Sequence, residues 1–236
     1  MLLRLSRAPR AAYRRALRRL RDLYYRTGYH ASYPFKQDVE ARLRAWESAD
    51  GRGDVPKDRD SWDEQYASGG WSFLGGINEL SHYSVIVGYA AHLKPDSSVI
   101  DVGCGHGVLH DRWARVGYRR YVGVDISEVA VNHLQAQELP GTLFVAADAE
   151  EYVPAERFDV VVFNESITYF ADPAAGFAKY VDALEPEGIV IVSCHQQSAR
   201  ARAILRDLEQ AWPVLDHTEV RQGSNSWRCV VFGPGH

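Results

Sequence analysis

The amino-acid sequence predicts an α/β fold built on a mostly parallel sheet, and three observations lead to this prediction. From residue 97 onward, short apolar runs alternate with segments of helical periodicity, which is typical of parallel strands joined by crossover helices. The apolar runs are nearly continuous in Val and Ile, as in strands buried on both faces. The chain has 236 residues, 46% of them apolar and 25% charged, which is the composition of an ordinary globular domain.

The alternating pattern assigns five strands and four crossover helices. The strands are expected at residues 97–101, 119–125, 142–146, 157–163 and 188–194, and the helices at 106–116, 127–138, 173–184 and 198–211. Before them, Ser61 and Glu64 have the spacing of a capping box, and residues 77–93 have helical periodicity. After them, residues 214–233 are typical of two strands around a Gly-Ser-Asn turn, which favours an antiparallel edge.

Residues 1–60 are predicted to form a helical extension to a domain that covers residues 61–236. A basic amphipathic helix is expected from near Pro9, because residues 1–26 hold nine arginines and one acid. A second helix is expected at residues 35–49. The loop that follows it is rich in Gly, Asp and Pro, which is typical of a hinge or boundary.

The role of the basic helix stays open on sequence alone. It is compatible with a membrane-surface helix, a targeting peptide, a homodimer or protein docking segment, or a helix packed on its own acidic body. That body carries a net charge of −12 against +8 for residues 1–26, which makes nucleic acid an unlikely partner.

Composition also restricts the environment of the chain. No apolar run approaches the roughly 18–20 residues that a membrane-spanning helix needs, so no membrane span is expected. The three cysteines lack metal-ligand spacing, so neither a disulfide framework nor a metal site is predicted. This cysteine usage favours a cytoplasmic location.

A glycine-rich loop follows the first predicted strand. The segment VIDVGCGHG places Gly103, Gly105 and Gly107 directly after a strand that carries Asp101. Glycines at this position allow a tight turn and let a ligand lie against the backbone at the start of the next helix. The third glycine comes too early for a dinucleotide fingerprint, and Asp101 suits a cationic ammonium better than a diphosphate.

Two more acids follow the next two strands. Asp125 ends the second strand, where a carboxylate accepts hydrogen bonds from ribose hydroxyls. Asp148 follows the third strand and can accept a bond from an adenine amino group, and Ala149 offers its backbone N–H to the ring. Any one of these acids alone is equally compatible with a helix cap or a turn. Acids at the ends of three successive strands favour a site for an adenosyl group.

These motifs resemble the class I S-adenosylmethionine (SAM)-dependent methyltransferases of small-molecule type. The resemblance covers roughly residues 60–232 and is carried by VIDVGCGHG, VGVDIS, ADAE, FDVVVFNESITYF and LEPEGIVIVS. It implies a Rossmann-like three-layer sandwich with a seven-stranded sheet, an antiparallel last strand, and SAM as the cofactor. It also implies that Ile126 and Asn164 contact the cofactor.

An aromatic stretch at residues 61–75 precedes this core and resembles a lid found in small-molecule members of the family. Tyr66 and Trp71 are expected to contact the cofactor, because aromatic faces attract a sulfonium cation and a Tyr hydroxyl can bind a carboxylate. Packing of these aromatics on the sheet is the alternative. Many relatives carry an arginine that can bind the methionine carboxylate of SAM, and this chain has His82 at that position. His82 or Tyr83 is therefore the candidate for binding the carboxylate.

Two residues are candidates for catalysis. Glu165 follows the fourth strand and His195 ends the fifth, so adjacent strands would bring both to the crevice where an acceptor lies. A histidine has the intrinsic pKa of a general base, and a nearby carboxylate orients it. The alternative makes Glu165 a helix cap and His195 a polar residue of the cleft. His106 and His110 have i, i+4 spacing, but no third metal ligand accompanies them.

The predicted function is methyl transfer from SAM to an O or N atom of a small molecule, with specialised metabolism or glycan tailoring suggested by the lid. The fourth motif reads Asn164-Glu165-Ser166-Ile167, which argues against a DNA adenine or glutamine-amide acceptor. Two alternatives remain: a protein or RNA methyltransferase recruited through the basic helix, and a SAM-binding regulatory protein without catalysis.

Overall fold

The structure is a computed structural model that describes residues 58–223 and 225–234. It also describes six isolated positions nearer the N-terminus: Leu23, Tyr24, Pro34, Asp38, Val39 and Arg42. Apart from these positions, the predicted basic helix, the predicted second helix and nearly all of the predicted hinge loop lie outside the described residues, as does Ser224 of the predicted C-terminal turn.

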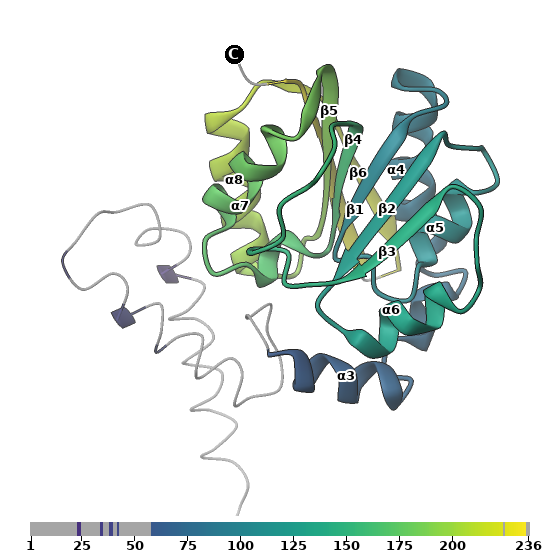
Figure 1. Ribbon diagram of the computed structural model, residues 1–236. Helices are drawn as coiled ribbons and strands as arrows, with labels where there is room; N and C mark the ends of the chain where they lie inside the picture. Colours follow the sequence, from purple (N-terminus) through teal and green to yellow (C-terminus); the bar gives the residue numbers. More distant parts are fainter. Residues whose placement is uncertain are drawn as a thin grey trace, which may run out of the picture.

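Seven strands form one sheet in the order β3-β2-β1-β4-β5-β7-β6 (Figure 1). β7 runs antiparallel to both of its neighbours, whereas β1 to β5 pair in parallel. The predicted seven-stranded, mostly parallel sheet with an antiparallel last strand is therefore confirmed. The strands are β1 (Ser98–Val102), β2 (Arg120–Asp125), β3 (Thr142–Ala146), β4 (Phe158–Asn164), β5 (Leu184–His195), β6 (Val214–Gln222) and β7 (Asn225–Phe232).

Helices cover both faces of the sheet and make the predicted three-layer sandwich (Figure 1). Alternate residues of β1 point to opposite faces, so Val99 belongs to one hydrophobic cluster and Ile100 to the other. One face carries α4 (Leu80–Leu93), α5 (Val108–Trp113) and α6 (Glu128–Gln135), and the other carries α7 (Pro173–Val181) and α8 (Ala199–Ala211). α3 (Arg59–Ala67) lies beside α6, and η2 (Ser72–Gly75) and η3 (Ile167–Tyr169) are short 3₁₀ turns.

Several predicted element boundaries are wrong. Asp58, not Ser61, caps α3, because the Asp58 carboxylate accepts a hydrogen bond from the backbone N–H of Ser61. α5 begins two residues later than predicted, because Gly107 adopts left-handed backbone geometry with a φ of 78°. β5 begins four residues earlier, because Leu184 already pairs with Phe158 across an irregularity in the ladder. α4 begins at Leu80 rather than at residue 77.

Across the residues described, no helix combines the length and the apolar character needed to cross a bilayer. Cys104, Cys194 and Cys229 are all buried, and none of the three forms a disulfide.

Candidate functional site

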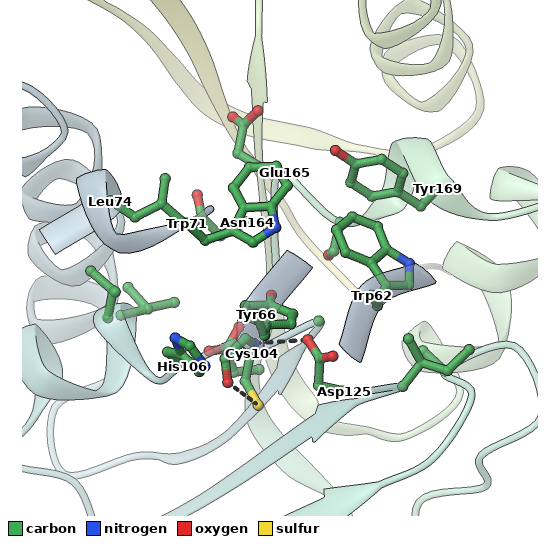
Figure 2. Close-up of a pocket in the computed structure, with 18 of the residues that line it drawn as sticks. Trp62, Tyr66, Trp71, Leu74, Cys104, His106, Asp125, Asn164, Glu165 and Tyr169 are labelled. Carbon is green, nitrogen blue, oxygen red and sulfur yellow. Dashed lines mark hydrogen bonds between the residues drawn. The ribbon is translucent and has the colours of Figure 1, made fainter. Parts of the chain in front are cut away.

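The carboxyl ends of the parallel strands open into a cavity of about 520 Å³. The residues that the sequence singled out for the cofactor and for catalysis line this cavity, except for Gly107 and for His82, one of the two candidates for the methionine carboxylate. Gly107 has a structural role instead, since a Cβ atom there would lie 2.5 Å from Leu134 Cδ2 on α6. Figure 2 shows the aromatic side chains of Trp62, Tyr66 and Trp71 around the same space as Asp125 and Glu165.

The glycine loop leaves room that any side chain would fill. A Cβ atom on Gly103 would lie 2.4 Å from Ser166 Cβ, and one on Gly105 would lie 2.6 Å from the hydroxyl oxygen of Tyr66. Both glycines have positive φ angles, of 81° and 52°, which side chains resist. The loop therefore presents bare backbone to the cavity at the start of α5.

Asp125 ends β2 and is only 7% exposed. One carboxylate oxygen accepts a hydrogen bond from the N–H of Gly105 at 2.8 Å, and the other accepts from the N–H of Ser127 at 2.9 Å. Burial raises the pKa of Asp125, while these two amide bonds favour its charged form. The carboxylate thus joins the glycine loop to the end of β2, next to Ile126.

Asp101 lies in the interior of the cavity wall and is 1% exposed. Its carboxylate accepts a hydrogen bond of 2.7 Å from the Tyr121 hydroxyl. Burial raises the pKa of Asp101 to about 7, although this hydrogen bond opposes the rise. A buried carboxylate of this kind is stabilised in its charged form by a cation.

The loop after β3 is held by α7. Asp148 accepts a hydrogen bond from the N–H of Glu150 at 2.8 Å, so its side chain also stabilises the turn. The Lys179 ammonium donates to the backbone carbonyls of Ala149, Glu150 and Tyr152, at 2.6, 2.9 and 2.8 Å. These bonds fix the backbone of Ala149 at the cavity wall.

The aromatic lid packs as a cluster and is anchored to α6. The ring centroids of Trp62 and Trp71 are 5.9 Å apart, and Trp62 makes an edge contact at 4.9 Å with Tyr169. Asp63 accepts hydrogen bonds from the Ser127 hydroxyl at 2.5 Å and from the N–H of Val129 at 3.1 Å. The aromatic stretch predicted to be a lid therefore borders the cavity and is fixed to α6 at Asp63.

Three polar atoms of cavity-lining residues are buried and have no hydrogen-bond partner among the residues that the structure describes. They are Trp71 Nε1, Asn164 Oδ1 and Ser166 Oγ. Buried polar atoms normally have partners, so these atoms indicate where a bound ligand completes the wall.

Glu165 directly follows β4 and lies next to His195, the last residue of the neighbouring strand β5. Asn164 pairs with Ser193, and the N–H of Glu165 donates to the Ser193 carbonyl at 2.8 Å. The backbone N–H of His195 donates to a carboxylate oxygen of Glu165 at 3.2 Å. Glu165 has a φ of 60°, an uncommon conformation for a residue with a side chain and one that often occurs at functional sites. Glu165 does not cap η3, whose N-cap is Ser166.

Of the histidines His82, His106 and His110, only His106 lines the cavity. His82 is 1% exposed, stacks on Trp227 with centroids 4.6 Å apart, and does not line the cavity. Tyr83 does line it and is the remaining candidate for the methionine carboxylate.

His106 precedes α5 and lines the cavity, whereas His110 is buried beside Tyr118, at 2.9 Å from its hydroxyl. The two therefore do not share a helix face.

Several lining residues were not singled out from the sequence. They include Glu79, Asn225 and Trp227. Glu79 comes from the start of α4 and the other two from β7, which reaches the cavity only through its antiparallel pairing with β5. No local motif marks these positions. Within residues 58–223 and 225–234, no cluster of His, Cys, Asp and Glu is arranged to hold a metal ion.

Comparison with known proteins identifies the family of this chain. Residues 77–228 match the family described as a methyltransferase domain. Trans-aconitate 2-methyltransferase of Escherichia coli is 32% identical over 98 residues, which cover 40% of this chain and 37% of that protein. Ubiquinone biosynthesis O-methyltransferase of Bradyrhizobium is 30% identical over 109 residues, covering 45% of this chain and 43% of that protein. The alignments thus span less than half of these relatives.

A solved structure shares the fold. The N-methyltransferase NodS from Bradyrhizobium japonicum, in complex with S-adenosylhomocysteine (SAH), superposes with a TM-score of 0.65. The match is 16% identical and covers 75% of this chain and 98% of that one.

The chain belongs to the methyltransferase domain family, and the resemblance to class I SAM-dependent methyltransferases is confirmed. The described residues fit SAM. The glycine loop leaves a cradle that a Cβ atom would fill, Asp101 and Asp125 face the cavity, and Trp71 Nε1 offers a buried donor.

The raised pKa of Asp101 predicts a pH dependence of SAM affinity. Asp101 is neutral below about pH 7 and must lose its proton to hold the ammonium group of SAM. Calorimetry should therefore give a Kd that rises about fivefold between about pH 7 and about pH 6. Asp101→Asn should bind more weakly at high pH and lose this dependence. A wild-type Kd that stays constant over this range would contradict the role of Asp101.

The buried indole N–H of Trp71, which has no hydrogen-bond partner among the described residues, predicts a stepwise loss of SAH affinity when Trp71 is replaced first by Phe and then by Ala. Trp71→Phe keeps an aromatic face and removes the donor, so SAH binding should weaken by about 0.5–1.5 kcal/mol. Trp71→Ala should lose a similar amount again, because the contact with Trp62 is also removed. Calorimetry on each variant measures both effects, and the unfolding temperature is the control. Unchanged affinity in both variants would make Trp71 a packing residue.

Proposed function

We propose that this chain transfers the methyl group of SAM to an O or N atom of a small-molecule acceptor. One observation carries the proposal: a single cavity joins the glycine loop and the acids of β1 and β2 to Glu165 and His195, under an aromatic lid. The aligned relatives are named as methyltransferases of trans-aconitate and of ubiquinone biosynthesis, which supports a small-molecule acceptor.

In this proposal the chain positions the reactants and moves one proton. When bound, SAM supplies a methyl group with a neutral thioether as its leaving group. The glycine loop, Asp101 and Asp125 hold the cofactor end, and the lid excludes water. Good alignment of the reacting atoms contributes about 7–11 kcal/mol to lowering a barrier. His195 takes the proton from the acceptor, and Glu165 positions His195 through its backbone N–H.

The proposal is tested with the full chain by two measurements. Calorimetry should show binding of SAM and SAH. Incubation with SAM and metabolite fractions, with acceptors of specialised metabolism and glycan tailoring included, should yield SAH and a product one methyl group heavier by mass spectrometry. Protein and RNA fractions in the same screen test recruitment of a macromolecule. SAM binding without a methylated product in any fraction would favour a regulatory protein.

The domain boundary near residue 60 is part of the proposal. Arg59 forms an ion pair of 2.6 Å with Glu128, and Asp63 bonds the start of α6, so α3 is joined to the methyltransferase domain. The helical extension of residues 1–60 would then be the recruitment or docking segment.

A further inference from the structure

The described wall of the cavity is strongly acidic. It contains six carboxylates and neither lysine nor arginine within the part of the chain that the structure describes. Asp101, Asp125 and Asp148 are assigned to the cofactor. The Glu150 carboxylate accepts hydrogen bonds from the backbone N–H groups of Ala171 and Asp172, at 2.9 and 3.1 Å. Glu79 and Glu165 are the remaining two carboxylates of this wall, and Glu165 also accepts a hydrogen bond from the backbone N–H of His195 at 3.2 Å.

Glu79 is a buried carboxylate without a compensating cation among the described residues. It is 7% exposed and lines the cavity at the start of α4. Its carboxylate lies 3.7 Å from His82 Nδ1. Burial lowers the pKa of His82 to about 4, so His82 is neutral at physiological pH and leaves the charge of Glu79 unbalanced. Burial also raises the pKa of Glu79 itself, because burial disfavours the charged form.

Glu79 and Glu165 both lie close enough to the Tyr83 hydroxyl to affect its ionisation. Burial raises the pKa of the Tyr83 hydroxyl, and the neighbouring carboxylates of Glu165, Asp101 and Glu79 raise it further. Trp71 and Trp227 line this cavity as well, and Trp227 makes an edge contact with His195 at 5.4 Å. Carboxylates together with aromatic faces favour an organic cation and disfavour an anion.

We infer that the acceptor carries an ammonium group, which Glu79 and Glu165 bind, and that its nitrogen is the atom methylated. This inference rests on the proposed function and specifies its substrate class. The bound ammonium first gives one proton to His195, which frees the lone pair of the amine. The amine nitrogen then forms a bond to the methyl carbon as the bond from that carbon to sulfur breaks and its electron pair stays on sulfur. The products are SAH and the N-methylated ammonium, and the proton on His195 passes to water.

Matched ligands test this inference by binding, without turnover. The full chain, saturated with SAH, is titrated by calorimetry with 2-phenylethylamine, 2-phenylethanol and phenylacetate, and with tryptamine, tryptophol and indole-3-acetate. In at least one triple, the ammonium member should bind about tenfold more tightly than the alcohol, and the carboxylate more weakly than both. Glu79→Gln should reduce the preference for the ammonium about tenfold. Glu187→Gln, at an exposed carboxylate of β5 outside the cavity, should leave it unchanged.

The outcomes separate this inference from the proposed function. If SAH binds but no ammonium member is preferred in either triple, the inference is overturned and methyl transfer to another acceptor stands. If Glu79→Gln weakens SAH binding and leaves the amine preference intact, Glu79 belongs to the cofactor, which also overturns the inference. If the wild-type chain binds neither SAM nor SAH, the proposed function itself fails. The wild-type titrations decide the matter even where a variant does not fold.

Discussion

Asp125→Ala should weaken SAM binding by about 1.5–3 kcal/mol, which is roughly a tenfold to 150-fold increase in Kd. The proposed role of this carboxylate is to accept hydrogen bonds from the ribose hydroxyls. It also accepts bonds from the N–H groups of Gly105 and Ser127, so its loss releases the glycine loop from the end of β2. Calorimetry with SAM and with SAH measures the effect on both ligands.

Asp125→Asn separates the charge from the shape of the side chain. An amide NH₂ would face either the N–H of Gly105 or that of Ser127, and both are donors. We therefore expect Asn to lose most of the affinity that Ala loses. Asp182→Ala, at the C-cap of α7 and away from the cavity, is the matched control. A folded Asp125→Ala variant with wild-type affinity for SAM would remove Asp125 from the cofactor site.

The fold could be predicted because its signals are local and periodic. The Val- and Ile-rich runs of β1, β2 and β4 are buried on both faces, as parallel strands are between two helical layers. Two of the boundaries that were wrong depend on single residues. Gly107 delays α5 through its backbone geometry, and Asp58 caps α3 from outside the predicted box.

The residues proposed to hold the cofactor were more predictable from the sequence than those proposed to hold the acceptor. Asp101 and Asp125 lie on adjacent parallel strands, whose carboxyl ends meet at one edge of the sheet, so their shared placement in the cavity follows from topology. Glu79 and Trp227 come from α4 and from β7. Only tertiary packing brings these two elements to the cavity, and neither residue belongs to a motif.

The positions of His106 and His110 also could not be predicted from a local sequence pattern. The i, i+4 spacing of His106 and His110 predicted one helix face, yet the helix begins between them. His110 is buried next to Tyr118, and His106 contacts Tyr66 with ring centroids 4.5 Å apart. Residue spacing alone could not distinguish a buried histidine from one that lines the cavity. The difference depends on Gly107, which caps α5 and so leaves His106 in the loop and His110 in the helix.

His195→Ala should lower kcat about 100-fold or more while SAM affinity stays close to that of the wild type. The reason is that His195 lines the cavity at the end of β5, where the acceptor is expected, and general base catalysis usually contributes roughly 100-fold to 10,000-fold. The measurement is steady-state turnover with the acceptor found by the screen, together with calorimetry for SAM. His92→Ala, at an exposed position of α4, should turn over at the wild-type rate.

Glu165→Gln tests whether the neighbouring carboxylate acts through its charge or its shape. Glutamine keeps an oxygen that can accept the N–H of His195, so a role limited to positioning that backbone predicts a small loss. A role for the negative charge, in binding a cationic acceptor, predicts a higher KM and a changed pH profile of kcat/KM.

If His195→Ala retains wild-type turnover across the pH range, no base is needed. Alignment of the reactants would then account for the rate, and the acceptor atom would have to reach the site with its lone pair already free.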